Sequence, residues 1–190
     1  EGRQVASWSC QTLLSAHRVL RSQEVVLPSP PGDDDRRAQL VQLDVHGQVV
    51  TVGNVHLTHL NHPTPADTPG WRARQLQTVL DALDRWGPCA LTIVCGDFNE
   101  DLNGESLRHF MQGPRALQDT FEPAGQPRPP TFCDDRAQGQ VLDHVLLVPA
   151  LTRARVQVAQ ATTVLRADQP DAHGTTPSDH SGLQVAFRIS

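Results

Sequence analysis

The sequence predicts a single mixed α/β domain over residues 1–190. Short apolar runs bounded by Gly, Pro and Asp recur along the chain, as expected of strands, and the segment 70–86 carries apolar residues at helical spacing. A chain of 190 residues can bury one core, and this one shows neither an internal repeat nor an interior linker. A second complete domain is not expected.

The N-terminal part is predicted to form strands around one tight turn. A strand ending at Leu27 runs into residues 28–35, which are rich in Pro and Asp and predict a solvated loop. Residues 40–45 and 49–57 are apolar on either side of His46-Gly47-Gln48, a pattern typical of a β-hairpin. Residues 58–69 contain three Pro and predict a loop of functional length.

The remaining elements alternate between helix and strand. Gly87-Pro88 ends the helix predicted over 70–86, and a buried strand over 91–95 then leads into Gly96-Asp97-Phe98-Asn99. A short helix is predicted over 105–111, residues 168–177 read as a polar loop, and the last strands are predicted at 141–148, 156–164 and 183–189.

Composition excludes some classes of protein. The net charge is −5 and all sixteen basic residues are Arg, so an electrostatic grip on nucleic acid by the whole surface is not expected. The apolar runs are too short for a transmembrane segment. The four Cys have no Cys-x-x-Cys spacing, and Cys89 and Cys95 flank a predicted strand that holds them too far apart for a disulfide. The sequence therefore predicts free thiols in a soluble, intracellular protein.

Four short segments carry the candidate chemistry: Asn54-Val55-His56, Gly96-Asp97-Phe98-Asn99, Leu142-Asp143-His144 and Ser178-Asp179-His180. Each places carboxylate, amide or imidazole groups at the end of a predicted strand, where a cleft can form. Hydrolysis of a phosphate ester needs a nucleophilic water, neutralisation of the non-bridging oxygens and help for the leaving oxygen. The ordered set supplies groups for all three tasks.

The residue chemistry suggests a role for each group. Asp97 can accept a proton from the attacking water, and Asn99 can bind a phosphate oxygen. His56 and His180 can donate to developing charge, Asp143 can orient one of them, and Asp179 is a hard-metal ligand. Asn54 and Arg72 are candidates for substrate binding.

Each segment also has an ordinary structural interpretation. Gly-Asp-x-Asn is a common turn, Ser178-Asp179-His180 can be a loop cap, and Asn54 can satisfy a neighbouring backbone group. Asp143 is harder to explain, because a carboxylate between apolar residues is costly unless it is paired. His144 should point away from the cleft, since neighbours on a strand face opposite ways.

Two further patterns are less specific. His56, His59 and His62 are three apart, but no recognised zinc-ligand spacing surrounds them, so His59 and His62 are expected only to line the loop. Arg72 and Gln75 lie one helical turn apart, and their face can reach the cleft or point to water.

At these residues the chain resembles the endonuclease/exonuclease/phosphatase superfamily of deoxyribonuclease I-like enzymes. The resemblance also covers residues 14–20, which are similar to a leucine-serine strand of that family, and Arg72-x-x-Gln75 at the start of the long helix. It implies a four-layer α/β/β/α sandwich of two mixed, mainly antiparallel sheets, with Mg²⁺ or Mn²⁺ in the cleft. It also implies that Asp97 activates water, that Asn99, His56 and His180 contact the phosphate, that Asp143 pairs with His180, and that Asp179 helps to bind the metal.

One departure affects the expected activity. Family members carry an Asn strand and a Glu metal ligand before the leucine-serine strand, and this chain begins after both. Gln23-Glu24 follows that strand, so Glu24 is interpreted as structural. We therefore expect a domain without its N-terminal third, with an exposed sheet, weak metal binding and little activity.

Two functions from different classes remain open at this point. The first is a metal-dependent hydrolase of a phosphate ester, whose substrate can be a nucleic acid, a phospholipid or a sugar phosphate. The second is a non-catalytic interaction module that binds a protein partner at the exposed sheet. The acidic balance favours a phospholipid, sugar phosphate or protein-linked phosphodiester over nonspecific cleavage of duplex DNA.

Overall fold

The computed structural model describes residues 11–31, 35–59, 67–121, 128–133, 139–165 and 178–190. Its main element is a six-stranded sheet with the strand order β1-β2-β3-β4-β8-β5. In chain order these strands are β1 (Arg18–Val26), β2 (Arg37–Val45), β3 (Gln48–His56), β4 (Leu91–Asp97), β5 (Gln118–Asp119) and β8 (Asp143–Leu147). Within this sheet β3 and β4 are parallel and the other neighbours are antiparallel.

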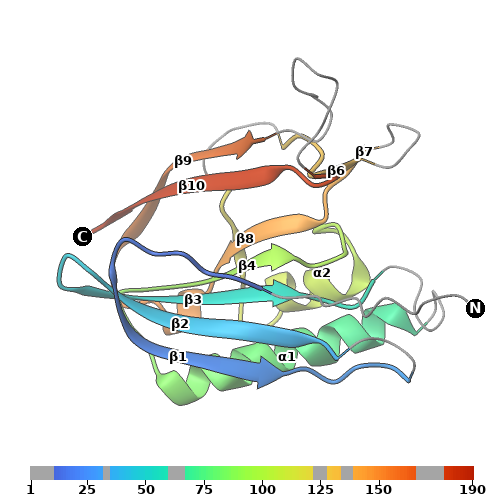
Figure 1. Ribbon diagram of the computed structural model, residues 1–190, viewed down its shortest axis with the longest axis horizontal. Coiled ribbons are helices and arrows are strands. Elements are labelled where there is room, and N and C mark those ends of the chain that lie inside the picture. The colour runs from blue at the N-terminus through green and yellow to red at the C-terminus, as the bar shows by residue number, and fades with distance from the viewer. Residues whose placement is uncertain (1–10, 32–34, 60–66, 122–127, 134–138, 166–177) are drawn as a thin grey trace, which may run out of the picture.

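Two helices and a separate ribbon complete the architecture. Figure 1 shows the helices along one side of the main sheet and the β9–β10 ribbon beyond β8. The helices are α1 (Thr68–Trp86) and α2 (Glu105–Gln112), and the ribbon pairs β9 (Val156–Val164) with β10 (Gly182–Ile189). Short elements are the pair β6 (Phe132–Cys133) and β7 (Gly139–Gln140) and the 3₁₀ turn Pro149–Leu151. The predicted α/β class with a mixed, mainly antiparallel sheet is confirmed.

The core lies between α1 and one face of the sheet. The parallel pairing of β3 with β4 requires a crossover connection, and α1 supplies it. The apolar side chains of α1, which recur every three to four residues, lie on one face of the helix. They pack on apolar strand residues, which recur every second position and so lie on one face of the sheet. Buried members of this core include Leu76, Val79, Leu80, Leu83, Leu40, Val55, Val94 and Leu146.

Most predicted elements are found where the sequence places them. The hairpin of β2 and β3 turns at His46 and Gly47, which both have positive φ, as a two-residue type I′ turn requires. The helix predicted over 70–86 begins slightly earlier, at Thr68, and the predicted short helix is α2. The predicted polar loop over 168–177 lies outside the described residues.

Two strand predictions need correction. The strand predicted over 141–148 begins only at Asp143, because the N–H groups of Leu142 and Asp143 both donate to Thr131 Oγ1 at 2.9 Å. Residues 14–17 are not in a strand: Leu14 is 92% exposed, and the Ser15 hydroxyl closes a local turn with His17. The first strand starts at Arg18.

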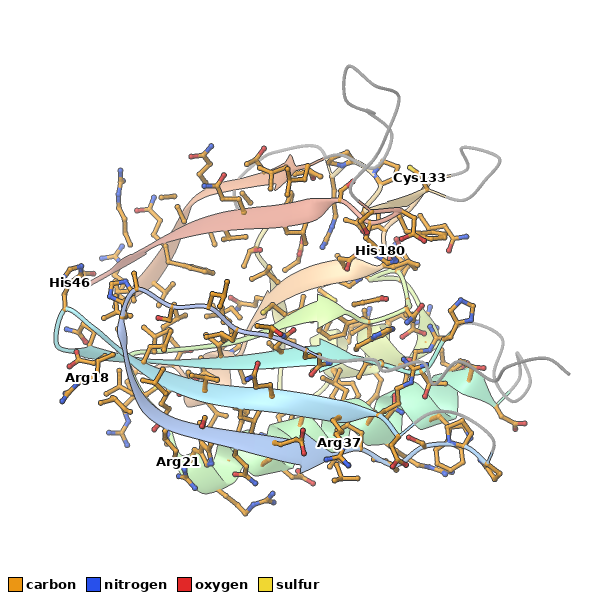
Figure 2. The ribbon with its side chains drawn as sticks, in the orientation of Figure 1. Arg18, Arg21, Arg37, His46, Cys133 and His180 are labelled. Atoms are coloured by element: carbon orange, nitrogen blue, oxygen red, sulfur yellow. The ribbon has the colours of Figure 1, made fainter. Side chains whose placement is uncertain are left out.

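Strand β1 is an edge strand of the main sheet and exposes apolar side chains, chiefly that of Val26, which is 63% exposed. Charged residues surround them. Arg18 pairs with Asp44 at 3.0 Å, and Arg37 pairs with Glu24. Figure 2 labels Arg18, Arg21 and Arg37 at this side of the molecule.

Two other observations concern the cysteines and the helices of the described residues. Cys89, Cys95 and Cys133 are free thiols, and Cys10 lies outside the described residues. In the part of the chain that the structure describes, none of the helices has the length and apolarity that crossing a bilayer requires.

Candidate active site

Three candidate residues lie in one row across three neighbouring strands. His56 on β3 is the register partner of Asp97 on β4, and Asp97 is the register partner of Asp143 on β8. Register partners project from the same face of a sheet, so these side chains converge. The parallel pairing of β3 with β4 is the cause, since it brings both strand ends to one edge.

The turn after β4 is shaped by two backbone positions. Gly96 has φ +126°, and a Cβ there would overlap the Val55 carbonyl oxygen on the adjacent strand. Asn99 has φ +52°, a region that Asn tolerates better than most residues. Between them Phe98 is fully buried and anchors the turn. Asp97 is thereby held at the open end of the sheet.

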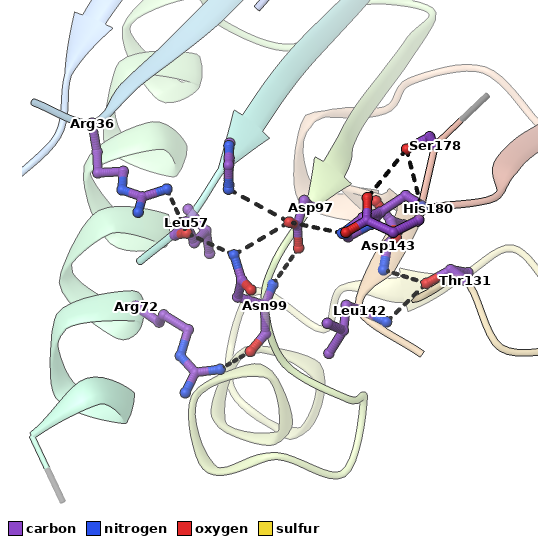
Figure 3. A network of polar contacts seen from close by, with 12 residues as sticks. Arg36, Leu57, Arg72, Asp97, Asn99, Thr131, Leu142, Asp143, Ser178 and His180 are labelled. Carbon is purple, nitrogen blue, oxygen red and sulfur yellow. Dashed lines mark hydrogen bonds and ion pairs between the residues drawn. The ribbon is translucent and has the colours of Figure 1, made fainter. Parts of the chain in front are cut away.

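Asn99 holds the carboxylate of Asp97. Its backbone N–H donates to Asp97 Oδ1 at 2.7 Å, and its side-chain Nδ2 donates to Asp97 Oδ2 at 3.2 Å and to the Leu57 carbonyl at 3.0 Å (Figure 3). Both amide protons are thus engaged, and Asn99 is buried. In this geometry Asn99 positions Asp97 and does not present its amide N–H groups to a ligand.

Two imidazoles approach the same oxygen of Asp97. His56 Nε2 lies 3.5 Å and His180 Nε2 lies 4.0 Å from Asp97 Oδ2. The far nitrogen of His180, Nδ1, is 2.8 Å from Asp143 Oδ2. Figure 3 shows His180 and Asp143 next to each other beside Asp97, with Thr131 below both. The predicted pairing of Asp143 with His180 is present in the structure.

The electrostatic environment differs between these groups. Burial raises the pKa of Asp97, and the charge of Asp143 raises it further. The Asn99 N–H and the two histidines lower it, but the raising effects are larger. Burial lowers the pKa of His56. The hydrogen bond to Asp143 raises the pKa of His180. Relative to the free side chains, these shifts favour the neutral form of His56, the protonated form of His180 and the protonated form of Asp97.

Arg72 and Gln75 face the protein interior, where neither the cleft nor water is their main neighbour. The Arg72 guanidinium donates to the Asn99 carbonyl, and Gln75 exchanges hydrogen bonds of 2.7–2.9 Å with Thr58. Both side chains are buried. Through these hydrogen bonds, α1 holds Thr58, just after β3, and Asn99, in the turn after β4.

Asn54 lies two residues before His56, on the same face of β3. Its register partners are Gln39 on β2 and Cys95 on β4, so it is one step further from the strand end. A cavity of about 360 Å³ opens beside His56, and its lining includes Ser22, Glu24, Arg36, Arg37 and Gln39. This space has both acidic and basic walls.

Asp179 is an exposed carboxylate beside the site. Its side chain contacts the Ser178 hydroxyl at 3.4 Å, while its carbonyl accepts a hydrogen bond from Cys133 N–H at 3.1 Å. Carboxylate oxygen is the donor that Mg²⁺ and Mn²⁺ prefer. Among the described residues, however, no group of three or more His, Cys, Asp or Glu side chains could hold a metal ion as they stand. The described residues therefore do not form a complete metal site.

Several supporting residues were not found by sequence reasoning. Thr131 Oγ1 accepts hydrogen bonds from the N–H groups of Leu142, just before β8, and Asp143, its first residue. The Arg128 guanidinium contacts the Asp143 carbonyl at 3.0 Å. Both follow a proline-rich segment with no periodicity, so no sequence pattern singled them out. His144 is buried on the opposite side of β8, as the alternation of strand side chains predicts.

The other predicted contacts lie at the limits of the described structure. His59 is exposed, and His62 lies outside the described residues, so the zinc alternative is untested. The same is true of most of the predicted loop over 58–69.

Comparison with known proteins identifies the family. Residues 12–180 match the model of the endonuclease/exonuclease/phosphatase family. No curated protein matches the sequence.

Solved structures agree at the level of the fold. A humanized D. rerio TDP2 carrying 14 mutations has a TM-score of 0.68 at 22% identity, covering 90% of this chain and 67% of that one. The human Nocturnin catalytic domain with bound sulfate has a TM-score of 0.66 at 21% identity, covering 91% of this chain and 60% of that one. A variant of the 3′ phosphatase NExo from Neisseria, bound to a product DNA hairpin, has a TM-score of 0.64 at 20% identity, covering 92% of this chain and 73% of that one.

Identities of 20–22% establish the sandwich fold and not the substrate. The chain spans only 60–73% of the length of these three proteins. With the fold, the ordered row of site residues and the family match taken together, the chain belongs to the endonuclease/exonuclease/phosphatase family, a family of phosphoesterase-type hydrolases.

Proposed function

We propose that this chain carries the hydrolytic site of a phosphate-ester hydrolase centred on Asp97. The observation that supports it best is the convergence of His56 and His180 on one oxygen of Asp97, with Asp143 behind His180. A structural turn or loop cap does not need two imidazoles aimed at a carboxylate whose pKa is raised by burial.

In this proposal each group has a separate task. Asp97 takes a proton from the attacking water, and its raised pKa suits it to that role. His180, whose pKa is raised by the hydrogen bond to Asp143, donates to a non-bridging or leaving oxygen of the ester. His56, whose pKa is lowered by burial, donates one N–H to a phosphate oxygen from the other side. Asn99 and Arg72 keep the turn in place, and Asn54 lines the approach.

Divalent metal dependence is a further part of the proposal. Mg²⁺ or Mn²⁺, when bound, would neutralise charge on the phosphate, and Asp179 is the residue of this chain that we assign to it. Family membership supports the assignment. Since the described residues lack a complete ligand set, we expect weak metal binding and low activity from these 190 residues alone.

The substrate class is open among nucleic acids, phospholipids and sugar phosphates. Similarity to a 3′ phosphatase solved with product DNA supports a nucleic-acid phosphate, whereas the net charge of −5 disfavours nonspecific binding of duplex DNA. The cavity beside His56 is a space that one side of the ester can occupy.

The test is hydrolysis of bis-p-nitrophenyl phosphate with and without Mg²⁺ or Mn²⁺. The 190-residue chain and an N-terminally extended version are compared, each with Asp97→Asn and with Asp81→Asn as a matched control on the exposed face of α1. We expect metal-dependent turnover that is stronger in the extended protein, lost in Asp97→Asn and retained in Asp81→Asn.

Two outcomes would count against parts of this proposal. Equal turnover by both lengths would mean that these 190 residues are sufficient for the metal. No turnover by either, together with tight binding of a protein partner in the absence of metal, would favour the non-catalytic interaction module. The exposed apolar residues of β1 are the surface on which such a partner would bind.

A further inference from the structure

A buried chain of polar groups lies behind the site and joins three of its supporting segments. It runs from Asp119 on β5 to Arg128, then to His144 on β8, and ends on the carbonyl of Glu100. The side chains of Arg128 and Asp119 are only 13% and 4% exposed. Charges buried this deeply are costly unless their partners are fixed.

Arg128 makes three hydrogen bonds with its guanidinium group. Its Nη1 lies 2.8 Å from Asp119 Oδ1, and its Nη2 donates to the Asp143 carbonyl at 3.0 Å and to His144 Nδ1 at 2.8 Å. The group also lies over the Phe121 ring, 5.0 Å from its centroid. A planar fork of fixed N–H donors can satisfy these partners together, which a single ammonium cannot.

These contacts fix the tautomer of His144. Arginine donates hydrogen bonds and never accepts them, so His144 Nδ1 must carry the lone pair. The proton then resides on Nε2, which donates to the Glu100 carbonyl at 2.7 Å. Burial, followed by the charge of Arg128, lowers the pKa of His144 to about 4, which keeps the ring neutral.

The two ends of this chain are directly connected to the site. Glu100 follows Asn99 in the turn that holds Asp97, and Asp143 is the residue whose carboxylate bonds His180. We propose that Arg128 and His144 are positioning residues, which hold the Asp143–His180 pair in register with the Asp97–Asn99 turn. The catalytic consequence rests on the proposed function, whereas the geometric one does not.

The alternative is that the same groups only stabilise the core. Arg128 variants separate the two cases if the readouts report on the site itself. Suitable readouts are the ¹⁵N signals of the His144 ring, which reveal its tautomer, and the signal of the proton that His180 Nδ1 shares with Asp143. Turnover numbers and KM values for bis-p-nitrophenyl phosphate add the catalytic readout.

The variants are Arg128→Met, which keeps the stem without the guanidinium, and Arg128→Lys, which keeps the charge without the fork. Arg153→Met removes an arginine from an exposed position as the matched control. In Arg128→Met we expect both tautomers of His144, loss of the His180 Nδ1 proton signal to solvent exchange, and kcat lower by about 10- to 100-fold at a similar KM. Arg128→Lys should show the same direction, and Arg153→Met should match the parent protein.

Two results would overturn the positioning role. One is a folded Arg128→Met that keeps both NMR signals, whether or not kcat falls. If Arg128→Met does not fold, the other is a folded Arg128→Lys that keeps both signals. Absence of turnover in the N-terminally extended protein would refute the proposed function alone, because the two NMR signals would still respond, or fail to respond, to Arg128.

Discussion

At the scale of single residues, Asp97 combines two opposing properties. Its carboxylate is buried near a second carboxylate, Asp143, and burial raises its pKa. A raised pKa means that the folded state holds the charged form less well than water does. The group that suits proton transfer is therefore one that destabilises the fold at neutral pH.

Asp97→Asn should separate these properties. The amide oxygen can still accept the Asn99 N–H, while the unfavourable charge is removed. We expect hydrolysis to fall by at least about 100-fold. We expect Tm at pH 7 to rise, at about 2–4 °C for each kcal/mol gained in a chain of this size. Thermal unfolding followed by circular dichroism measures the second effect, and a Tm no higher than that of the parent chain would contradict it.

His144 gives the clearest pH dependence. Its pKa is about 4 in the folded protein against an ordinary value of 6.5, so the unfolded chain binds the proton more tightly. Its contribution to stability is complete above about pH 6.5 and is lost as the pH falls toward 4. The total corresponds to about 3 kcal/mol at 1.36 kcal/mol per unit of pKa difference.

The test compares urea unfolding of the parent chain and His144→Gln between pH 7 and pH 4. Glutamine keeps a neutral side chain with a donor and an acceptor, and it does not titrate. The parent should lose stability more steeply over this interval than the variant does. If the free energy of unfolding falls with pH to the same extent in both proteins, protonation of His144 does not reduce the stability of the folded protein.

At the scale of elements, α2 depends on a residue outside it. Glu100 accepts hydrogen bonds from the N–H groups of Ser106 at 3.2 Å and Leu107 at 3.0 Å, and from the Ser106 hydroxyl. The residue before the helix, Gly104, provides no side-chain cap. Glu100 therefore acts as the N-terminal cap of α2 while its carbonyl receives the His144 hydrogen bond.

Glu100→Ala should lower the free energy of unfolding by about 1–3 kcal/mol, because buried N–H donors lose their acceptor. Glu105→Ala, in the exposed first turn of the same helix, should cost no more than about 1 kcal/mol. Denaturant unfolding of both variants measures the difference. Equal losses would show that the cap contributes nothing beyond the general effect of a negative charge near the helix N-terminus.

At the scale of the whole molecule, the sheet ends in a strand with exposed apolar side chains. In β1 the exposed fractions are 51% for Val19, 43% for Leu20 and 63% for Val26. Unpaired backbone N–H and C=O groups on an edge strand can form hydrogen bonds with another chain, and charges such as those of Arg18 and Glu24 oppose this association. The balance predicts weak, concentration-dependent self-association.

Val26→Lys should reduce that self-association, because it places a charge on the apolar part of β1. Gln48→Lys adds the same charge at the distant hairpin turn and should leave association unchanged. Sedimentation velocity over a wide concentration range distinguishes the variants. A parent chain that stays monomeric throughout would contradict the prediction.

Local sequence patterns determined much of the fold. The helical period over 70–86, the apolar run before Gly96-Asp97-Phe98-Asn99 and the turn at His46-Gly47 each specify structure through interactions between near neighbours. The same patterns named all the candidate residues, because ordered polar groups at strand ends are visible in a single sequence. The sequence placed the start of β8 two residues too early, because the N–H groups of Leu142 and Asp143 donate to the hydroxyl of Thr131, which no local pattern relates to them.

The tertiary structure alone decided how these residues work together. Parallel pairing of β3 with β4 and antiparallel pairing of β4 with β8 put His56, Asp97 and Asp143 in one row, and register across strands is not written in any local pattern. The interior roles of Arg72, Gln75 and Arg128 depend likewise on which backbone groups the fold brings to them. The sequence determined which residues are candidates for the chemistry, and long-range packing determined which of them touch, because contact energies depend on distances that only the folded chain defines.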